Sequence, residues 1–321
     1  VGPKTAMAIV AVVTAGLLLV SGAGPAGATW SVVAVDEETG EVGAAIASCV
    51  DGAVLSDPTK PLTLLVMVPG ELVAVTQGQL NISAAQRIRE LHQGGLGPDA
   101  IMADISGASF DELASQRQHA VVAWPGSTSL DRAGTDRAAD PLALVAPIAV
   151  AYTGADTFSA AGDAQGAGVS VQGNLLASAD VVTKSLAAYE ATAASGGSLA
   201  DSLVAGLTAG AAEGGDRRCG PQTALFAHLA VTGHTEQGTA GQTEQGVEVM
   251  VLTVLVNQDD VNPVEELAAA YSSGKSGLID LRERSNSAAV VQLAAGFVGV
   301  LVAVVGVIMF RRGLGSVRAR R

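Results

Sequence analysis

Few residues in this sequence are of the types that do covalent chemistry, and the common arrangements of such residues are absent. There is no G-x-S-x-G elbow, no H-E-x-x-H zinc motif and no phosphate-binding Walker loop. None of the histidines has metal-ligand spacing, and two of them lie in strand-like runs, where a structural role is commoner. We therefore expect neither a metal site nor a cofactor. The histidines are His92, His119, His228 and His234.

Thr29 differs from these residues because of what precedes it. Residues 6–20 form an apolar run of the length found in secretory signal peptides, and Ala26-Gly27-Ala28 matches a signal peptidase site. Cleavage after Ala28 would make Thr29 the first residue, so that a hydroxyl nucleophile and its base, the α-amine, would share one residue. Two alternatives stay open: an uncleaved signal anchor, and a threonine that merely follows the signal.

The composition limits the class of protein. A chain of 321 residues, 49% of them hydrophobic, with a net charge of −13 allows one large folded domain or two smaller ones. Residues 1–28 and 288–321 contain no Asp or Glu, and the part between them carries 31 acidic residues against 12 basic ones. A surface this acidic repels phosphate backbones, so we expect no nucleic-acid partner.

The C-terminal region predicts a membrane anchor. Residues 288–310 are apolar except for Gln292, and these 23 residues are enough for a helix that spans a lipid bilayer. The arginines that follow place the tail in the cytoplasm under the positive-inside rule. We therefore expect a cell-membrane protein with one span. Its parts are a signal peptide at 1–28, an extracytoplasmic domain at 29–281, a stalk at 282–287, the span at 288–310 and a basic tail at 311–321.

Between these ends the apolar periodicity predicts one α+β domain with largely antiparallel sheets, because strands and helices come in blocks. Asn81-Ile82-Ser83 matches a glycosylation sequon, but Ser83 and Gln86 favour a helix cap there. A polar stretch, 272–287, is expected to lead toward the membrane. The strands are expected at 29–36, 41–48, 62–68, 71–77, 119–124, 147–153, 169–172, 222–232 and 247–257, and the helices at 82–93, from about 98, and at 178–194, 198–213 and 263–271.

Short motifs are distributed over nearly all of 29–272. They are Thr29-Trp30-Ser31-Val32-Val33-Ala34-Val35-Asp36, Thr39-Gly40-Glu41-Val42-Gly43, Val75-Thr76-Gln77, Tyr152-Thr153-Gly154, Val171-Gln172-Gly173-Asn174-Leu175-Leu176, Gly214-Gly215-Asp216-Arg217-Arg218 and Asn262-Pro263-Val264-Glu265-Glu266-Leu267. In sequence and order they resemble the domain-of-unknown-function 1028 family, which is assigned to the N-terminal-nucleophile (Ntn) hydrolase superfamily. In that family the threonine typically follows the initiator methionine, whereas here signal cleavage would expose it.

The resemblance implies a fold and a reaction. The fold is the four-layer αββα sandwich of the superfamily, with two antiparallel sheets between layers of helices. In the reaction the Thr29 hydroxyl would attack an amide carbonyl while its α-amine moves the proton. We therefore expect a membrane-anchored, extracytoplasmic hydrolase of a small amide or peptide. The alternative is a non-catalytic surface binding or adhesion module on the same fold.

Such a reaction needs donors for the negative charge that develops on the substrate oxygen. The side-chain amide of Asn174 is one candidate, and the backbone N–H groups of Gly173, Gly214 and Gly215 are others, because glycine lets a backbone approach a ligand closely. These assignments are an analogy with the superfamily's chemistry.

Four further residues are candidates for binding. Asp216 and Arg217 would hold a charged substrate group or the α-amine, or else they form an ion pair within a turn. Gln77 and Gln172 lie in the matching motifs and are weaker candidates for contact with the substrate.

Both cysteines lie near these motifs. Cys49 follows the second expected strand, and Cys219 lies in 214–222, where the sequence departs from the commonest form of the family. In an exported domain a Cys49–Cys219 disulfide is favoured over the alternative, a reactive thiol with a lowered pKa. The disulfide would tie the second strand to the glycine-rich segment.

Overall fold

In the computed structural model of the protein, nearly all of the described residues belong to the expected extracytoplasmic domain. The expected signal peptide, membrane span and basic tail, and nearly all of the stalk, lie outside the described residues. Among the helices that are described, none is both long and apolar enough to cross a bilayer. The described residues are 29–50, 62, 64–124, 146–232, 241–242, 248–257 and 261–282.

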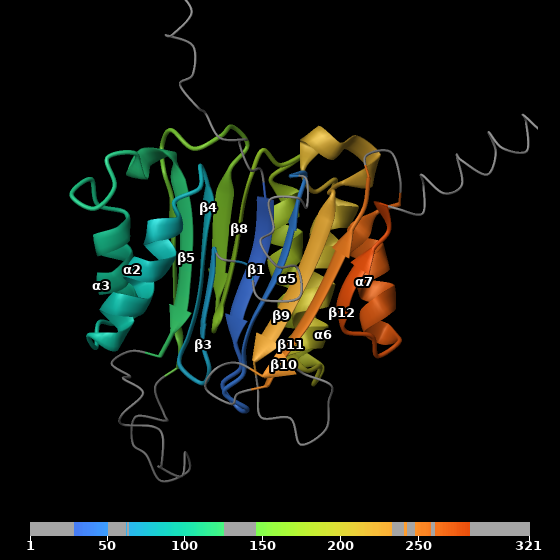
Figure 1. Ribbon diagram of the computed structural model, residues 1–321, viewed down its shortest axis with the longest axis horizontal. Coiled ribbons are helices and arrows are strands. Elements are labelled where there is room, and N and C mark those ends of the chain that lie inside the picture. The colour runs from blue at the N-terminus through green and yellow to red at the C-terminus, as the bar shows by residue number, and fades with distance from the viewer. Residues whose placement is uncertain are drawn as a thin grey trace, which may run out of the picture.

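Two β-sheets form the centre of the domain (Figure 1). The larger sheet has the order β10-β11-β9-β2-β1-β8-β7, with β12 paired to β11, and the smaller has the order β3-β4-β5-β6. Every pairing is antiparallel except that of β11 with β12. The strands are β1 (Thr29–Val35), β2 (Val42–Ser48), β3 (Leu65–Val68), β4 (Leu72–Gly78), β5 (Arg117–Ala123), β6 (Ile148–Thr153), β7 (Gly162–Gly166), β8 (Val169–Asn174), β9 (Phe226–Thr232), β10 (Gly241–Gln242), β11 (Glu248–Leu255) and β12 (Gly277–Asp280).

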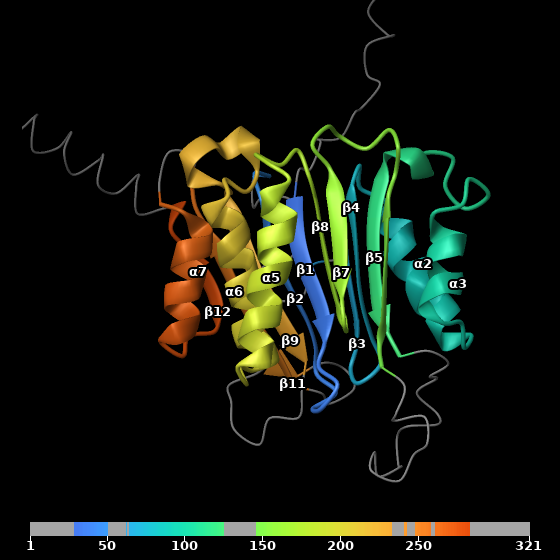
Figure 2. The same ribbon diagram turned by 180° about the vertical axis from the view of Figure 1, so that it is seen from behind.

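Helices cover the outer face of each sheet, so the domain has four layers (Figures 1 and 2). Two helices lie on the smaller sheet, and three lie on the larger one. The helices of the smaller sheet are α2 (Ile82–Gln93) and α3 (Pro98–Ile105), and those of the larger sheet are α5 (Asp180–Ala194), α6 (Leu199–Ala212) and α7 (Pro263–Ser272). Short 3-10 helices occur at η2 (Ala114–Gln116) and η5 (Arg217–Gln222).

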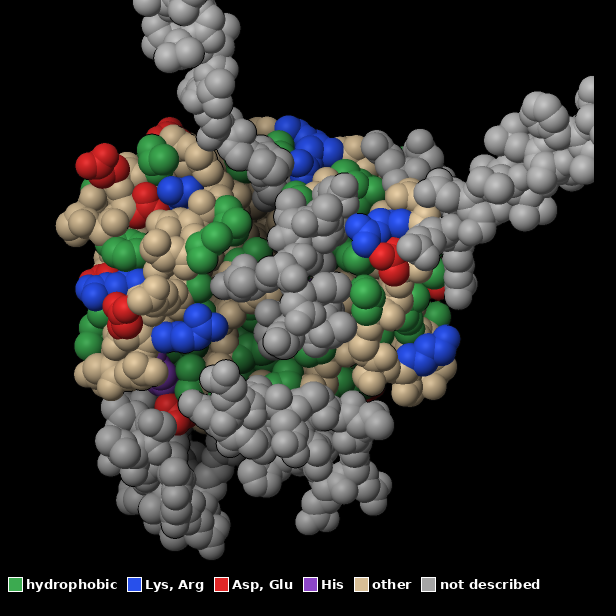
Figure 3. Space-filling view, viewed as in Figure 1, with side chains coloured by type: hydrophobic (Ala, Val, Ile, Leu, Met, Phe, Trp, Pro, Cys, Tyr) green, Lys and Arg blue, Asp and Glu red, His purple; other side chains and the backbone are tan. Residues whose placement is uncertain are grey.

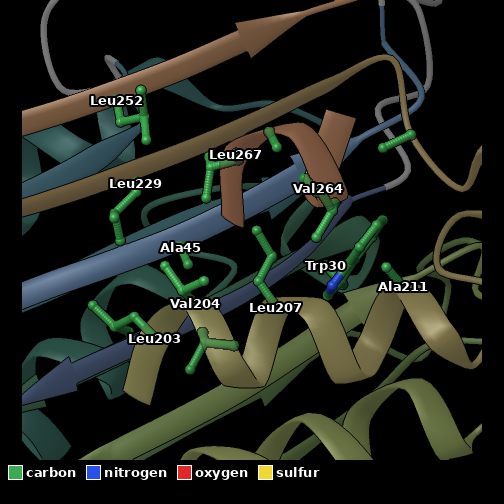
Figure 4. Close-up of a cluster of buried hydrophobic side chains, with 14 of the residues drawn as sticks. Trp30, Ala45, Leu203, Val204, Leu207, Ala211, Leu229, Leu252, Val264 and Leu267 are labelled. Carbon is green, nitrogen blue, oxygen red and sulfur yellow. The ribbon is translucent and has the colours of Figure 1, made fainter. Parts of the chain in front are cut away.

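Strand alternation divides the side chains of β1 between two cores. Trp30, Val32 and Ala34 pack against the helices of the larger sheet, while Val33 and Val35 face the smaller sheet. Figure 4 shows Leu207 of α6 in the helix-side core, near Trp30. A strand whose residues are buried on both faces reads as a continuous apolar run, as residues 32–35 of β1 do.

The expected α+β class and the mostly antiparallel pairing are confirmed. Three strands were not expected: β7, the two-residue β10, and β12 within the stretch predicted as a polar connection. The first turn of α2 also differs in its cap. Asn81, one residue before the helix, accepts a hydrogen bond from the Ser83 backbone N–H, so Asn81 rather than Ser83 is the cap. Its side-chain amide also donates to Asp111 at 2.6 Å.

Candidate functional site

Thr29 begins β1, an interior strand of the larger sheet that lies between β2 and β8. It lies between Ser48 of β2 and Asn174 of β8 in the strand register, and 8% of its surface is exposed. The Thr29 Oγ1 hydroxyl donates a hydrogen bond to Ser48 Oγ at 3.2 Å. By strand alternation Thr29 and Ser31 share the face of the sheet that is turned toward the smaller sheet. The hydroxyl is thus held at one end of the layer between the two sheets.

A group of buried polar side chains lies beside Thr29, between the sheets. Three come from alternate positions of β8, one from β1, and one each from β4 and β5 of the smaller sheet. All are nearly inaccessible to solvent, so each needs hydrogen-bond partners within the protein. We call these residues the amide network: Ser31, Gln77, Gln118, Ser170, Gln172 and Asn174.

Gln118 joins the two sheets. Its Nε2 donates to the backbone oxygens of Gly173 at 3.0 Å and Gly162 at 3.1 Å, and to Thr153 Oγ1 at 2.9 Å. Its Oε1 accepts from Gln77 Nε2 at 2.8 Å and from Asn174 Nδ2 at 3.2 Å. One side chain therefore binds partners from β4, β6, β7 and β8.

Gln77 extends the network to the first strand. Its Nε2 also lies 3.4 Å from the backbone oxygen of Thr29, and its Oε1 accepts from Ser31 Oγ at 2.7 Å. Ser31 Oγ accepts in turn from Gln172 Nε2, whose side-chain oxygen accepts from Ser170 Oγ at 3.1 Å. Gln77 and Gln172, expected to contact substrate, are therefore brought together, but as buried members of this network.

Asn174 and Gly173, the candidate oxyanion donors on β8, lie at the same end of the sheet. The Asn174 Nδ2 group already donates a hydrogen bond to Gln118 Oε1. Its Oδ1 atom, by contrast, is buried and has no hydrogen-bond partner in the described part of the chain. Gly173 pairs with Trp30 of β1 and with Gly162 of β7, and a Cβ atom on it would lie 2.7 Å from Leu176 Cδ2.

Gly214 and Gly215 end helix α6. The Gly214 N–H donates to the carbonyl of Ala211 at 2.9 Å, and the Gly215 N–H donates to the carbonyl of Gly210 at 3.1 Å. Both residues have positive φ, and a Cβ atom on Gly215 would lie 2.6 Å from the Trp30 ring. The helix end and the packing on Trp30 thus explain why glycine occupies these two positions. Both N–H groups already donate to backbone carbonyls of α6.

Asp216 is fully buried, and its ion-pair partner is Arg218 rather than Arg217. One Asp216 oxygen accepts from Arg218 Nη2 at 2.7 Å and from the Cys49 backbone N–H at 3.0 Å. Arg217 is exposed, and its Nη2 donates to Ser159 Oγ at 2.7 Å. The expected ion pair in a turn is therefore present with a different arginine. On the face seen in Figure 3, basic side chains lie in small separate groups.

The expected Cys49–Cys219 disulfide is present, with a Cα–Cα distance of 5.7 Å. It joins the residue after β2 to the 3-10 helix η5. Because Ser48 directly precedes Cys49 and binds the Thr29 hydroxyl, the disulfide and the Asp216 hydrogen bond together fix the end of β2 beside Thr29.

Backbone strain gathers in the loops around this end of the sheet. Ala160, Leu175 and Thr223 are the described non-glycine residues with positive φ. Leu175 follows Asn174 directly, its N–H donates to Ser159, and its carbonyl accepts from the Arg217 N–H. Strained residues of this kind concentrate at functional sites, so the convergence of these loops supports the placement of the site at Thr29.

The histidines in the described residues are not part of this network. His228 Nδ1 lies 2.8 Å from Thr253 Oγ1 on the β9 and β11 strands, and burial lowers the pKa of His228 to about 4. Burial likewise lowers the pKa of His119, which stacks on Tyr152, to about 4. Both are neutral structural residues near pH 7. The described residues contain no cluster of His, Cys, Asp and Glu that would hold a metal.

The sequence interpretation missed Ser31, Ser48, Gln118 and Ser170 as site residues. One signal was available: Ser170, Gln172 and Asn174 recur with a period of two in an otherwise apolar strand, which predicts a strand with one polar face. Gln118 gave no comparable signal, because its role depends on the other sheet.

Comparisons with known proteins identify the family of the chain. A family model described as "Family of unknown function (DUF1028)" matches residues 29–267. No curated protein matches the sequence. A crystal structure of a protein from Silicibacter pomeroyi, described under the same family, is similar in fold with a TM-score of 0.52. The two sequences are 19% identical over 78% of this chain and 87% of that chain. Because the family match begins at Thr29 and spans most of the chain, the protein belongs to the DUF1028 family.

Proposed function

We propose that the protein is an N-terminal-threonine hydrolase of the Ntn type that cleaves an amide or peptide bond. The observation that carries this proposal is the position of Thr29. It follows an expected signal peptidase site, and the family match begins with it. It also starts the interior strand β1, with its hydroxyl hydrogen-bonded to Ser48 beside a buried polar network. The arrangement of two sheets between helical layers supports the superfamily assignment.

The proposed reaction has two steps, and water is the second reactant. Thr29 Oγ1 attacks the carbonyl carbon of the substrate amide, and its proton passes to the Thr29 α-amine. The C–N bond then breaks, the amine product leaves with that proton, and an ester remains on Thr29. Water hydrolyses the ester with the same α-amine as base, which releases the acid and restores the hydroxyl.

The developing negative charge on the substrate oxygen needs donors close to Thr29. The N–H groups of Gly214 and Gly215 already bond to the end of α6. Asn174 Nδ2 is a buried side-chain donor in register with Thr29, although it donates to Gln118 here. We propose that the substrate oxygen accepts from the second N–H of this group while the first stays on Gln118. We also propose that the exposed Arg217, whose side chain donates to the uncharged Ser159, meets a charged group of the substrate.

The proposed site faces the outside of the cell. The signal peptide at 1–28, the span at 288–310 and the arginine-rich tail at 311–321 would leave the acidic domain extracytoplasmic, anchored in the lipid bilayer. A disulfide in the domain fits such an oxidising compartment. The substrate would then be a small amide or peptide outside the cytoplasm.

The test compares three substitutions in the processed protein. Thr29→Ala removes the nucleophile and is expected to lower hydrolysis of a panel of amide substrates by on the order of 10⁴-fold or more. Thr29→Ser keeps a hydroxyl and the α-amine and should retain measurable hydrolysis. Thr183→Ala, on the exposed surface of α5, is the matched control and should leave the rate unchanged. The melting temperature of Thr29→Ala should stay within a few degrees of the wild type, and full activity in this variant would remove Thr29 from the mechanism.

A non-catalytic binding module is the second candidate. The candidate oxyanion donors favour this function, because Gly214, Gly215 and Asn174 Nδ2 all donate hydrogen bonds to partners within the protein. A covalent probe for N-terminal threonine separates the two functions. Labelling of Thr29 supports the hydrolase, and absence of labelling in a correctly processed protein supports the binding module.

A further inference from the structure

The amide network has a fixed direction of hydrogen bonding. Gln118 Nε2 contacts two backbone carbonyl oxygens, of Gly162 and Gly173, and a carbonyl oxygen can only accept. The amide of Gln118 can therefore be oriented in only one way, with Oε1 turned toward Gln77 and Asn174. This orientation requires a donor from each of those residues.

The same logic fixes the two neighbouring amides. Gln77 Nε2 also faces a backbone carbonyl, that of Thr29, which confirms that this end of the side chain donates. Asn174 must present Nδ2 to Gln118, because its oxygen there would face another oxygen. Asn174 Oδ1 is therefore turned away from Gln118. It is the one oxygen or nitrogen of the network's side chains that is buried with no partner in the described part of the chain.

Asn174 lies directly opposite Thr29 in the register of β8 and β1, on the same face of the sheet. Side chains that are paired in this way have Cβ atoms about 5 Å apart, so the Asn174 carboxamide can reach the main chain at Thr29. Its side chain is 0% exposed, and an unpartnered acceptor at such a position is destabilising. Before processing, the Thr29 nitrogen is a peptide nitrogen with one N–H. After cleavage it is an ammonium with three N–H donors.

We propose that Asn174 Oδ1 accepts a hydrogen bond from the α-ammonium of Thr29 that processing creates, and so positions the amine next to the Thr29 hydroxyl. Asn174 is thus a positioning residue. Gln118 holds it through Nδ2, and the backbone oxygens of Gly162 and Gly173 hold Gln118. The inference rests on the cleavage before Thr29 that the proposed function requires. It does not depend on hydrolysis of any substrate.

Cleavage before Thr29 should affect the stability of the protein. Processing supplies a partner for a buried acceptor, so the processed protein should be more stable than the same protein with one residue added before Thr29. The added residue moves the ammonium away from Asn174 and returns a peptide N–H to Thr29. We expect the unfolding equilibrium constant to be about tenfold lower for the processed wild type, the size of one charge-assisted hydrogen bond.

The experiment is a cycle of full-length chains unfolded in denaturant in the same detergent. One pair has Asn174 and begins either at Thr29 or at a valine inserted between Ala28 and Thr29. The second pair carries Asn174→Leu, and mass spectrometry checks every N-terminus. The tenfold difference should fall to less than twofold with Asn174→Leu. It should persist in a matched control, Ser170→Ala, which shortens the far end of the network.

Three results would overturn the inference: equal stability of the first pair, a difference that survives Asn174→Leu, or a mature N-terminus other than Thr29. If Asn174→Leu does not fold, a crystal structure of the processed wild type decides, since a distance from the Thr29 nitrogen to Asn174 Oδ1 below 3.2 Å supports the inference and one above 4 Å contradicts it. An inactive protein that shows the stability difference would reject the hydrolase proposal alone.

Discussion

The layer between the two sheets has two parts with opposite character. Its apolar part is filled by Val, Ala, Ile and Leu side chains from both sheets, whereas its polar end at Thr29 is filled by the amide network. The change occurs within single strands: β1 passes from Ser31 to Val33, and β4 from Val75 to Gln77, on one face. Both parts are equally inaccessible to water.

The difference indicates that the polar end was not built for stability. A buried aliphatic side chain contributes about 1.5–3 kcal/mol, while a buried neutral hydrogen bond contributes about 1 kcal/mol net and is costly when one partner is missing. A fully apolar layer would hold the sheets together at least as well. The network instead fixes the directions of donors and acceptors around Thr29, which is what a site for chemistry needs.

The largest expected effect on stability comes from acid, through the buried histidines outside the polar end. The pKa values of His119 and His228 are lowered by burial to about 4 from 6.5. Between pH 6.5 and 4 the unfolded chain binds more protons at these sites than the folded one, so stability is complete above pH 6.5 and falls as the pH falls. The fall should be up to about 1.4 kcal/mol per pH unit for each histidine.

Urea unfolding at pH 7, 6 and 5 measures this effect. The matched variant is His228→Gln, which keeps a hydrogen-bonding side chain toward Thr253 without a titrating group near neutrality. Its stability should depend about half as steeply on pH as that of the wild type. An unchanged slope would show that His228 does not titrate as its burial implies.

The second effect concerns the disulfide beside the polar end. The double substitution Cys49→Ser with Cys219→Ser removes a covalent link between residues 170 positions apart. It should lower the free energy of unfolding by about 4 kcal/mol. Because Cys49 follows Ser48, the loss should also reduce the reactivity of Thr29 toward a covalent probe. Differential scanning calorimetry and probe labelling measure the two consequences. Normal labelling in the folded variant would show that the disulfide does not help to position Thr29.

The smallest effects come from a matched pair of substitutions that contrasts the two parts directly. Ile46→Ala in the apolar part should cost about 3 kcal/mol, because it leaves a cavity, and should leave probe labelling of Thr29 in the folded protein unchanged. Gln118→Leu at the polar end should cost about 2 kcal/mol through unpaired partners and should strongly reduce labelling. Chemical unfolding and labelling rates test both. Equal labelling in the two variants would remove the distinction between the parts.

Much of the fold could be predicted from local sequence. The hairpin of β1 and β2 and the helices α2, α5, α6 and α7 follow from apolar period and turn residues, and the structure places them within a few residues of the expected bounds. Strand β7 could not be predicted, because Gly162–Gly166 has little β-propensity and is a strand through its pairing with β8. Strand β12 similarly depends on parallel pairing with β11.

The site could be predicted only in part. Thr29, Asn174 and the disulfide follow from signals in the sequence, namely a cleavage site, matching motifs and two cysteines in an expected exported domain. The partners within the site do not. Gln118 and Asn174 form their hydrogen bond between the two sheets, and Asp216 pairs with Arg218 rather than with its neighbour Arg217 because of side-chain geometry. Such contacts depend on tertiary packing.

The most direct test of the central claim is the N-terminal sequence of the mature protein extracted from membranes. We expect Thr-Trp-Ser-Val, so that Thr29 carries a free α-amine at the start of β1. Any other N-terminus would leave the Thr29 hydroxyl without its own base and would contradict the proposed mechanism.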